Sequence, residues 1–407
     1  MERESMTRRK ILICDDSQEY GRSYKNRLKS IKVIEDFFEE PILASKKELE
    51  QAIEALETRR QLAIDNKIKD YSGGDAAQII DDAAILIIDY ALYDLDSHVT
   101  GERIAYLARC YSRCGFIVAL NQFPPYVEEY FDLTLRGHLE SYADLNIPGE
   151  SLVNPGLWLE PWSGFRPWCW PLLPQSVEKL EGLIDELNGN LDVKILEFLG
   201  FEGANSLSLP RSSIEFLSRE NPEEMTFRKF VDSTGSGNGL RGRKEQPINE
   251  EAIARIAASR IGCWLEYDVL PGQNILVDAP HLVSRYPSLL GDKAQDIDAW
   301  SRTASFSEPD ALGLSPIIET YRFEKSNWLS RPVWFWNDLS DYEEIDEVRD
   351  PWSANLPGYV FGEDISKFIF SDDARSFVAD LESPFVRRYV KYLESRISYT
   401  PLVRFSM

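Results

Sequence analysis

The sequence has 407 residues, a formal net charge of −23 and 43% hydrophobic residues, a composition typical of a globular protein and unlike that of a disordered chain. The acidic excess argues against general affinity for nucleic acid, because duplex binding depends on lysine and arginine contacts to phosphate. The length favours two or three domains.

The first part of the chain alternates predicted strands with predicted helices. Continuous apolar runs are typical of strands that are buried on both faces of a parallel sheet. Charged runs with apolar residues every three or four positions predict the helices between them. The predicted strands cover residues 11–14, 41–44, 84–89, 116–120 and 142–147, and the predicted helices cover 19–30, 46–69, 102–113 and 126–139.

Acidic residues follow two of these strands directly. Asp15 and Asp16 come after the first strand, and Asp89 ends the third. In an open α/β sheet, ligands bind beyond the carboxyl ends of the strands, where the strand order reverses. We therefore expect the three carboxylates to meet at one point, where they would suit a Mg²⁺ ion; helix capping by the same residues is the alternative interpretation.

Four short motifs carry a resemblance to a known family. They are Ile-Leu-Ile-Cys-Asp-Asp at 11–16, Leu-Ile-Ile-Asp at 86–89, the Thr-Gly pair at 100–101 that opens a helix, and Phe-Ile-Val-Ala-Leu at 116–120. Over about the first 150 residues the chain resembles the receiver domain of response regulators in two-component signalling. The resemblance implies a doubly wound, five-stranded parallel sheet of the flavodoxin-like type. It also implies that Asp15, Asp16 and Asp89 bind Mg²⁺ and that Asp89 accepts a phosphoryl group from a histidine kinase.

The sequence departs from the receiver pattern in two places. Receivers carry Ser or Thr at the end of the fourth strand and Lys after the fifth, and both contact the phosphoryl group. Here Asn121 stands at the first position and Ile147-Pro148 near the second. Without the ammonium, the clamp on a phosphoryl oxygen is lost, so a degenerate receiver whose acidic face serves for docking is the alternative to an active one. The 73 residues between Asp16 and Asp89 also exceed one strand-helix unit and indicate a lengthened helix over 46–69.

The rest of the chain predicts a helical connector and a mixed α+β domain. We expect a receiver-like domain over 1–190, a connector with a flexible Gly/Ser-rich loop over 191–247, and a C-terminal α+β domain over 248–407. The predicted helices of this part cover 175–187, 192–199, 211–218, 223–231, 248–265, 371–381 and 384–397, and the predicted strands cover 274–278, 331–336 and 359–361.

A second candidate site lies in the C-terminal part. Asp278 ends a predicted strand, and His281 and Arg285 are spaced to share one face of the following helix. Histidine is suited to acid–base work near neutral pH. An enzyme that uses these residues is therefore the alternative to a signalling protein, although a structural histidine is the favoured interpretation because no nucleophile motif accompanies it.

Two segments are candidate interaction surfaces. Residues 158–170 are rich in tryptophan and proline, which indicates a loop that either packs over the domain or contacts a partner. Residues 338–347 are acidic and predict either a solvated face or a surface for a basic partner. Cys110 and Cys114 share a predicted helix, and buried free thiols are favoured over a metal site that would lack two ligands.

These features together predict a cytoplasmic signalling or regulatory protein. No apolar run approaches the length of a membrane span, and no signal peptide precedes the first strand. The expected partners are proteins, among them a histidine kinase, with no membrane and no nucleic acid; a homo-oligomer stays open. By analogy of fold alone, receiver-like domains with large unfamiliar C-terminal regions resemble modules of bacterial multi-gene systems, including defence systems.

Overall fold

The computed structural model describes residues 9–71, 74–92, 99–121, 141–159, 170–234, 247–290, 294–304, 314, 316–340, 358–378 and 387–394. The helix predicted over 126–139 lies outside these residues. So do residues 341–347 of the acidic segment and residues 235–246 of the glycine- and serine-rich segment.

A five-stranded parallel sheet forms the first part of the chain. Its order is β2-β1-β3-β4-β5, the order of the flavodoxin-like doubly wound fold. The central strand β3 is almost wholly buried, because its run Ala-Ala-Ile-Leu-Ile-Ile-Asp is covered on both faces. The prediction of a five-stranded parallel sheet is therefore confirmed. The strands are β1 (Lys10–Cys14), β2 (Ile42–Leu43), β3 (Ala83–Asp89), β4 (Phe116–Asn121) and β5 (Leu145–Pro148).

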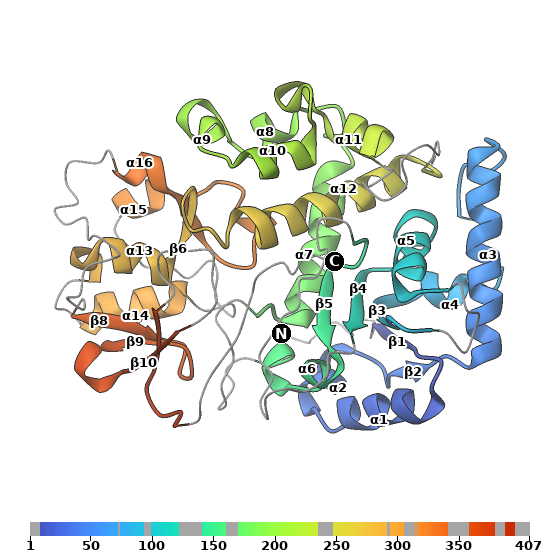
Figure 1. The fold of residues 1–407 in the computed structure, drawn as a ribbon, viewed down its shortest axis with the longest axis horizontal. Helices are drawn as coiled ribbons and strands as arrows, with labels where there is room; N and C mark the ends of the chain where they lie inside the picture. Colours follow the sequence, from blue (N-terminus) through green and yellow to red (C-terminus); the bar gives the residue numbers. More distant parts are fainter. Residues whose placement is uncertain are drawn as a thin grey trace, which may run out of the picture.

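Helices cover both faces of this sheet (Figure 1). Each of the longer ones begins at a residue whose side-chain oxygen accepts a hydrogen bond from the first turn: Ser17, Ser45 and Thr100. The helix between β2 and β3 is long, as predicted, and a further short helix follows it. The helices are α1 (Gln18–Lys29), α2 (Lys32–Phe37), α3 (Lys46–Ile64), α4 (Gln78–Asp81), α5 (Gly101–Tyr111) and α6 (Gly149–Leu152).

Two long helices, α7 (Leu173–Leu187) and α12 (Glu250–Trp264), join the sheet to the rest of the chain. They pack against each other, and α12 also contacts α5 (Figure 1). The guanidinium of Arg255 donates to the carbonyl oxygen of Ser112 at 2.8 Å, just before β4. Buried apolar side chains form one cluster that extends from Ile11 to Val390, so the core continues across these helices.

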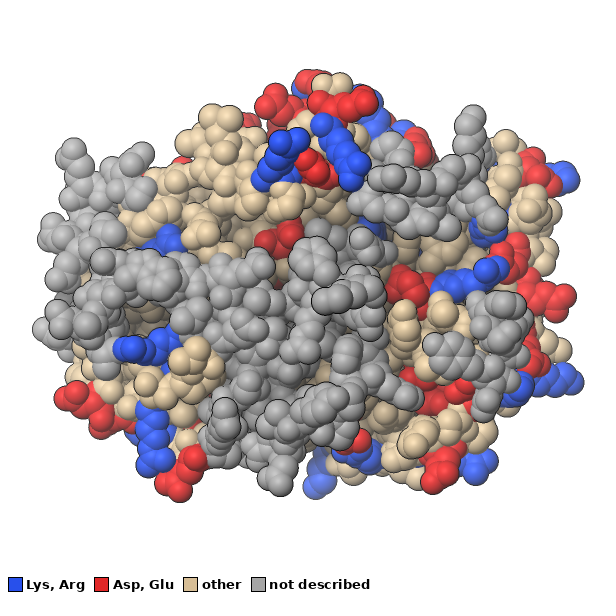
Figure 2. Space-filling model, in the orientation of Figure 1, with Lys and Arg blue, Asp and Glu red and all other residues tan. Residues whose placement is uncertain are grey.

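A group of short helices lies above α12 in Figure 1. It consists of α8 (Ile195–Phe198), α9 (Gly203–Leu207), α10 (Arg211–Leu217) and α11 (Phe227–Thr234). On its surface Arg228 pairs with Asp192 at 2.8 Å and Lys194 pairs with Glu224 at 2.6 Å. On the face shown in Figure 2, acidic and basic side chains are likewise interspersed among the described residues.

The C-terminal part contains small sheets and short helices. The strands β6 (Leu276–Asp278) and β7 (Val333–Phe335) form an antiparallel pair. A four-stranded sheet has the order β10-β11-β8-β9, in which β11 and β8 are parallel and the other pairs are antiparallel. The remaining elements are α13 (Ala279–Arg285), α14 (Ala294–Thr303), α15 (Pro316–Thr320), α16 (Trp336–Ser340), β8 (Tyr359–Gly362), β9 (Lys367–Phe370), β10 (Arg375–Val378) and β11 (Arg387–Val390).

The predictions of helices over 371–381 and 384–397 are wrong. Residues Arg375–Val378 and Arg387–Val390 pair instead as antiparallel strands, after a single 3₁₀ turn at Ser371–Asp373. Pairing with a neighbouring strand overrides the weak helical preference of these sequences. The C-terminal part is thus mixed in its secondary structure, as expected, while the domain boundaries stay predictions. No helix of the described residues combines the length and the apolar composition needed to cross a membrane.

Candidate metal centre

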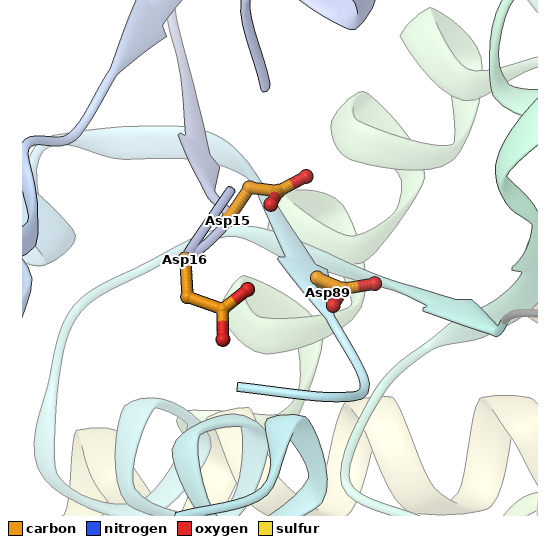
Figure 3. Close-up of side chains that lie close together, drawn as sticks. All are labelled: Asp15, Asp16 and Asp89. Atoms are coloured by element: carbon orange, nitrogen blue, oxygen red, sulfur yellow. The ribbon is translucent and has the colours of Figure 1, made fainter. Parts of the chain in front are cut away.

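Asp15, Asp16 and Asp89 come together at the carboxyl ends of β1 and β3. One carboxylate oxygen from each lies within 4.8 Å of the others, and Figure 3 shows the three side chains around one point. The chain leaves β1 toward β2 on one side, while β3 lies on the other side of β1. The acids therefore stand where the strand order reverses, which is where open α/β sheets bind ligands.

Backbone amides fix two of the carboxylates. Asp15 Oδ1 accepts a hydrogen bond from the N–H of Ser17 at 2.8 Å, and Asp89 Oδ2 accepts one from the N–H of Ala91 at 3.2 Å. Both acids are buried, with 4% and 6% of their surface exposed, whereas Asp16 is half-buried. The three carboxylates therefore lie close together in a site that is only partly open to water.

The buried acids hold their protons unusually tightly. Burial raises the pKa of Asp15 to about 6, and the carboxylate of Asp16 adds to the effect. Burial raises the pKa of Asp89 to about 7, and the carboxylates of Asp15 and then Asp16 raise it further. No lysine or arginine of the described residues forms an ion pair with Asp15 or Asp89. Asp15 and Asp89 therefore concentrate negative charge in a buried place without an ion-pair partner among the described residues.

A glycine allows α5 to start directly against the end of β3. A Cβ atom at Gly101 would lie 2.3 Å from the carbonyl oxygen of Asp89 and 2.8 Å from Cα of Tyr90. The N–H of Gly101 donates to the carbonyl oxygen of Tyr90 at 2.9 Å. This contact fixes the first turn of α5 beside Asp89, and no larger residue fits without moving the backbone.

Tyr24 is a neighbour of the site that the sequence did not single out. Burial raises its pKa to about 12, and the charges of Glu150, Asp15 and Asp89 contribute. A Cβ at Gly149, directly after β5, would lie 2.0 Å from the Tyr24 hydroxyl oxygen. The tyrosine thus reaches from α1 toward the turn after β5. Gly149 leaves room for its hydroxyl group there, a contact between residues that are distant in the sequence.

The two positions where the chain departs from the receiver pattern lie on β4 and β5. Asn121 ends β4 and pairs with Pro148, so its backbone stands at the same edge of the sheet as Asp89; its side chain lies outside the described part. Ile147 is completely buried. The described end of β5 therefore presents an apolar residue where a lysine was expected from the resemblance.

The donor set suits a hard divalent cation. Carboxylate oxygens are the ligands that Mg²⁺ prefers, and it usually binds through a few of them and completes its shell with water. Two of these three carboxylates are desolvated without a charged partner, a situation that a bound cation relieves. Asp15, Asp16 and Asp89 fit such an ion, which would supply positive charge next to Asp89.

The second predicted site is only partly assembled. Nδ1 of His281 lies 2.6 Å from Oδ1 of Asp278, and both side chains are buried. Arg285 points elsewhere: its guanidinium lies 3.8 Å from the centre of the Trp336 ring and donates to the carbonyl oxygen of Gln273. The structure thus brings Asp278 and His281 into hydrogen-bond distance, while Arg285 lies near enough for its charge to help lower the pKa of His281.

The surroundings of His281 are typical of a structural cluster. Its Nε2 lies 3.1 Å from the guanidinium of Arg388, which also donates to the buried Glu363. Burial lowers the pKa of His281 to about 4 against the opposing effect of Asp278, so the ring is neutral near pH 7. These contacts join α13 to β11, and they leave little room for the ring to accept a proton from a substrate.

The described ends of the tryptophan-rich segment are buried, whereas Asp338 at the start of the acidic segment is exposed. Trp158 and Trp170 are buried, and the indole N–H of Trp158 donates to the carbonyl oxygen of Leu152 at 2.7 Å. Asp338 accepts from the side-chain amide of Asn205 at 3.2 Å. Cys110 and Cys114 are buried free thiols, as predicted. The centres of both surfaces lie outside the described residues.

Comparison with family models, curated proteins and solved structures found no match for this chain.

Proposed function

We propose that this chain is a signalling or regulatory protein whose parallel-sheet domain acts as a receiver. In this proposal Asp15, Asp16 and Asp89 hold Mg²⁺, and Asp89 accepts a phosphoryl group from the phosphohistidine of a histidine kinase. The observation that carries the proposal is the convergence of three carboxylate oxygens within 4.8 Å at the tips of β1 and β3. The strand order and the close start of α5 at Gly101 support it.

The chemistry follows from the position of Asp89. An ionised Asp89 oxygen attacks phosphorus, the bond from phosphorus to the leaving nitrogen breaks, and an aspartyl phosphate forms. A cation held by Asp15, Asp16 and Asp89 would offset the charge of the phosphoryl oxygens and favour the ionised form of Asp89 at neutral pH. Because the described end of β5 carries Ile147 in place of a lysine, the cation has to supply a larger share of this offset than in other receivers.

The output in this proposal passes through α5. The helix begins against Asp89, and near its other end the carbonyl oxygen of Ser112 accepts from Arg255 of α12. The buried guanidinium of Arg109 pairs with Asp144, and Asp144 also accepts from the hydroxyl of Ser259 on α12. These contacts link the acidic site to the C-terminal part, where protein partners would bind.

Phosphorylation of the full chain tests the proposal. The protein is incubated with Mg²⁺ and acetyl phosphate, and its intact mass is measured. We expect the mass of one added phosphoryl group on the wild type and on Asp36→Asn, an exposed acid on α2, and none on Asp89→Asn. A phosphoryl group that persists in Asp89→Asn would contradict the assignment.

A second arm separates an active receiver from a degenerate one. Beryllofluoride with Mg²⁺ is added to the wild type, and the bound fluoride is observed by ¹⁹F NMR. Binding that disappears in Asp89→Asn supports an active site. Mg²⁺ binding without beryllofluoride binding or phosphorylation would leave the degenerate version, in which the acidic face serves for docking. Absence of Mg²⁺ binding would contradict both the active and the degenerate version of the receiver.

A further inference from the structure

A cavity lies between α7 and the segment that precedes β7. Its volume is about 600 Å³, within the range of sites that take small molecules. A smaller cavity beside it shares Lys179 and Ser330 and reaches Phe116, the first residue of β4. The cavity is therefore at the amino end of the parallel sheet, whereas the three acids lie at the carboxyl end, so it is a separate site.

One face of α7 forms one wall, and the opposite wall is the chain before β7. Residues on the helix wall recur every three or four positions, which is the spacing of a single helical face. Both walls mix apolar and polar side chains. The helix contributes Gln175, Ser176, Glu178, Lys179, Gly182, Leu183 and Glu186, and the opposite wall includes Arg322, Asn327, Leu329 and Arg331.

Lys179 is the cationic group on the helix wall, and its charge is only partly compensated. Its closest carboxylate oxygen belongs to Glu266 and lies 3.8 Å from Nζ, too far for a hydrogen bond. Glu266 already accepts hydrogen bonds from the N–H of Ser330 at 2.7 Å and from the Ser330 hydroxyl. Burial lowers the pKa of Lys179, and Glu266 only partly offsets this. The ammonium therefore lacks a close acceptor among the described residues.

Two carboxylates stand on the same wall: Glu178 lies 3.8 Å from the guanidinium of Arg9, and Glu186 is fully hydrogen-bonded. Glu186 accepts from Nζ of Lys325 at 2.6 Å, from the amide of Asn327 at 2.9 Å and from the indole N–H of Trp328 at 2.9 Å. Arg331 adds a second buried positive group to the opposite wall. Arg331 itself pairs with Glu266 at 3.4 Å. The lining as a whole carries Lys179, Arg322 and Arg331 against Glu178 and Glu186, an excess of one positive charge.

A glycine opens the space in front of this charge. Gly182 lies in the interior of α7, where glycine is less favourable than alanine. A Cβ atom there would meet nothing within 4 Å, so close packing does not require the glycine. Because the residue lines the cavity three positions after Lys179, any longer side chain at 182 would project into the space beside the ammonium.

We propose that this cavity binds a small molecule with one anionic group, a carboxylate or a phosphate, on an apolar body. The anionic group pairs with Lys179, and the apolar body packs against Leu183 and Leu329. Gly182 provides the room. The inference does not depend on the proposed receiver chemistry, because it uses none of the acidic residues.

Binding of three related probes to the full chain tests this proposal. Phenyl phosphate and phenylacetate carry the two anionic groups, and benzyl alcohol is their neutral counterpart; saturation-transfer NMR titrations give the dissociation constants. We expect at least one anionic probe to bind at least tenfold more tightly than benzyl alcohol. The anionic probe that binds more tightly shows whether the site prefers a phosphate or a carboxylate.

Three variants locate the site. Lys179→Met keeps an unbranched side chain of nearly the same length without its charge. It is expected to weaken binding of the anionic probe at least tenfold and to leave binding of benzyl alcohol unchanged. Gly182→Leu fills the cavity and is expected to abolish binding of every probe. Gly189→Leu is the matched control: a Cβ there also meets nothing within 4 Å, and the residue follows α7 without lining the cavity. It should bind as the wild type does.

Melting curves first confirm that each variant is folded. Equal affinity for charged and neutral probes would overturn the assignment of an anionic ligand. Binding that survives both Lys179→Met and Gly182→Leu would place the probe elsewhere and overturn the site. Failure of both anionic probes to bind the folded wild type in the millimolar range would overturn the proposal as a whole, while leaving the receiver assignment untouched.

Discussion

Asp15 and Asp89 end two neighbouring parallel strands, and the carboxylate of Asp15 adds to the effect of burial in raising the pKa of Asp89 to about 7. Two buried acids that repel each other are a cost that the fold carries without help from the described cations. Such pairs are common at functional sites, because the arrangement that destabilises the free protein is the one that binds a positive ligand. The consequences can be measured in stability, metal binding and pH dependence.

The first prediction concerns stability against pH without divalent ions. A carboxyl group whose pKa is higher in the folded state binds protons more tightly there, so the free energy of unfolding falls as pH rises from the unfolded value of 3.8 to about 7. We expect Asp89→Asn to remove this decrease and to be more stable than the wild type at pH 8, by roughly 2–4 kcal/mol. Urea denaturation in EDTA at several pH values measures it, and Asp36→Asn should follow the wild type. If Asp89→Asn were less stable than the wild type at pH 8, the carboxylates of Asp15 and Asp89 would not destabilise the folded protein by repulsion.

The second prediction concerns Mg²⁺. At pH 8 the acids are ionised, so added Mg²⁺ should raise the melting temperature, and the gain should grow with concentration as expected for a ligand of the folded state. Below pH 6 protons compete for Asp15 and Asp89, so the gain should shrink. Differential scanning fluorimetry of the wild type and of Asp16→Asn checks this. An equal gain in the variant would place the ion elsewhere.

The third prediction concerns the glycine at the start of α5. Gly101→Ala brings a Cβ within 2.3 Å of the carbonyl oxygen of Asp89, so the first turn of the helix has to move away from the strand. We expect a loss of about 1–3 kcal/mol in stability and weaker Mg²⁺ binding. Gly189→Ala, where the new methyl group meets nothing, is the control. If Gly101→Ala is destabilised but binds Mg²⁺ with unchanged affinity, the close start of α5 matters for packing and not for the metal site.

The sequence was informative where burial on both faces dictates composition. Strands β1, β3 and β4 are uninterrupted apolar runs, and the sheet sets their alignment: Ile13 pairs with Ile87, and Asp89 with Leu120. Once both runs are in one parallel sheet, Asp15 and Asp89 have to share an edge. The candidate metal centre was therefore predictable from the ends of two strands.

Composition was a poor guide at the exposed C-terminal strands. Strand β10 is mostly exposed, and the residues before it, Ser371–Asp373, offer the serine and acids of a helix start. Its state is decided by pairing with β11, a contact that local preference does not contain. Tyr24 and Lys179 were missed for a related reason, since each acts through a neighbour that is distant in the sequence.

The fourth prediction concerns the buried ion pair that supports α12. Asp144 accepts from Arg109, from the hydroxyl of Ser259 and from the N–H of Ile117, and it is buried. Arg109→Met leaves this carboxylate without its cation, so we expect a loss of about 3–5 kcal/mol. Addition of Asp144→Asn should restore part of it. Arg211→Met, which removes a surface pair with Glu215, should cost below about 1 kcal/mol. Equal losses of stability in Arg109→Met and Arg211→Met would refute a structural role for the buried pair.

The last prediction uses a histidine whose effect on stability opposes that of Asp89. Burial lowers the pKa of His281 to about 4 in the folded state, against 6.5 when unfolded, so the unfolded chain binds the extra proton between these values. Stability from this group is complete above pH 6.5 and is lost as pH falls toward 4, by up to roughly 3 kcal/mol. In Asp15→Asn/Asp89→Asn, where the opposing effects of both raised carboxyl pKa values are removed, stability should therefore rise with pH in this window, and addition of His281→Gln should flatten the curve. NMR of the His281 ring gives its pKa directly, and a value near 6.5 would show that the ring is hydrated rather than packed against Asp278 and Arg388.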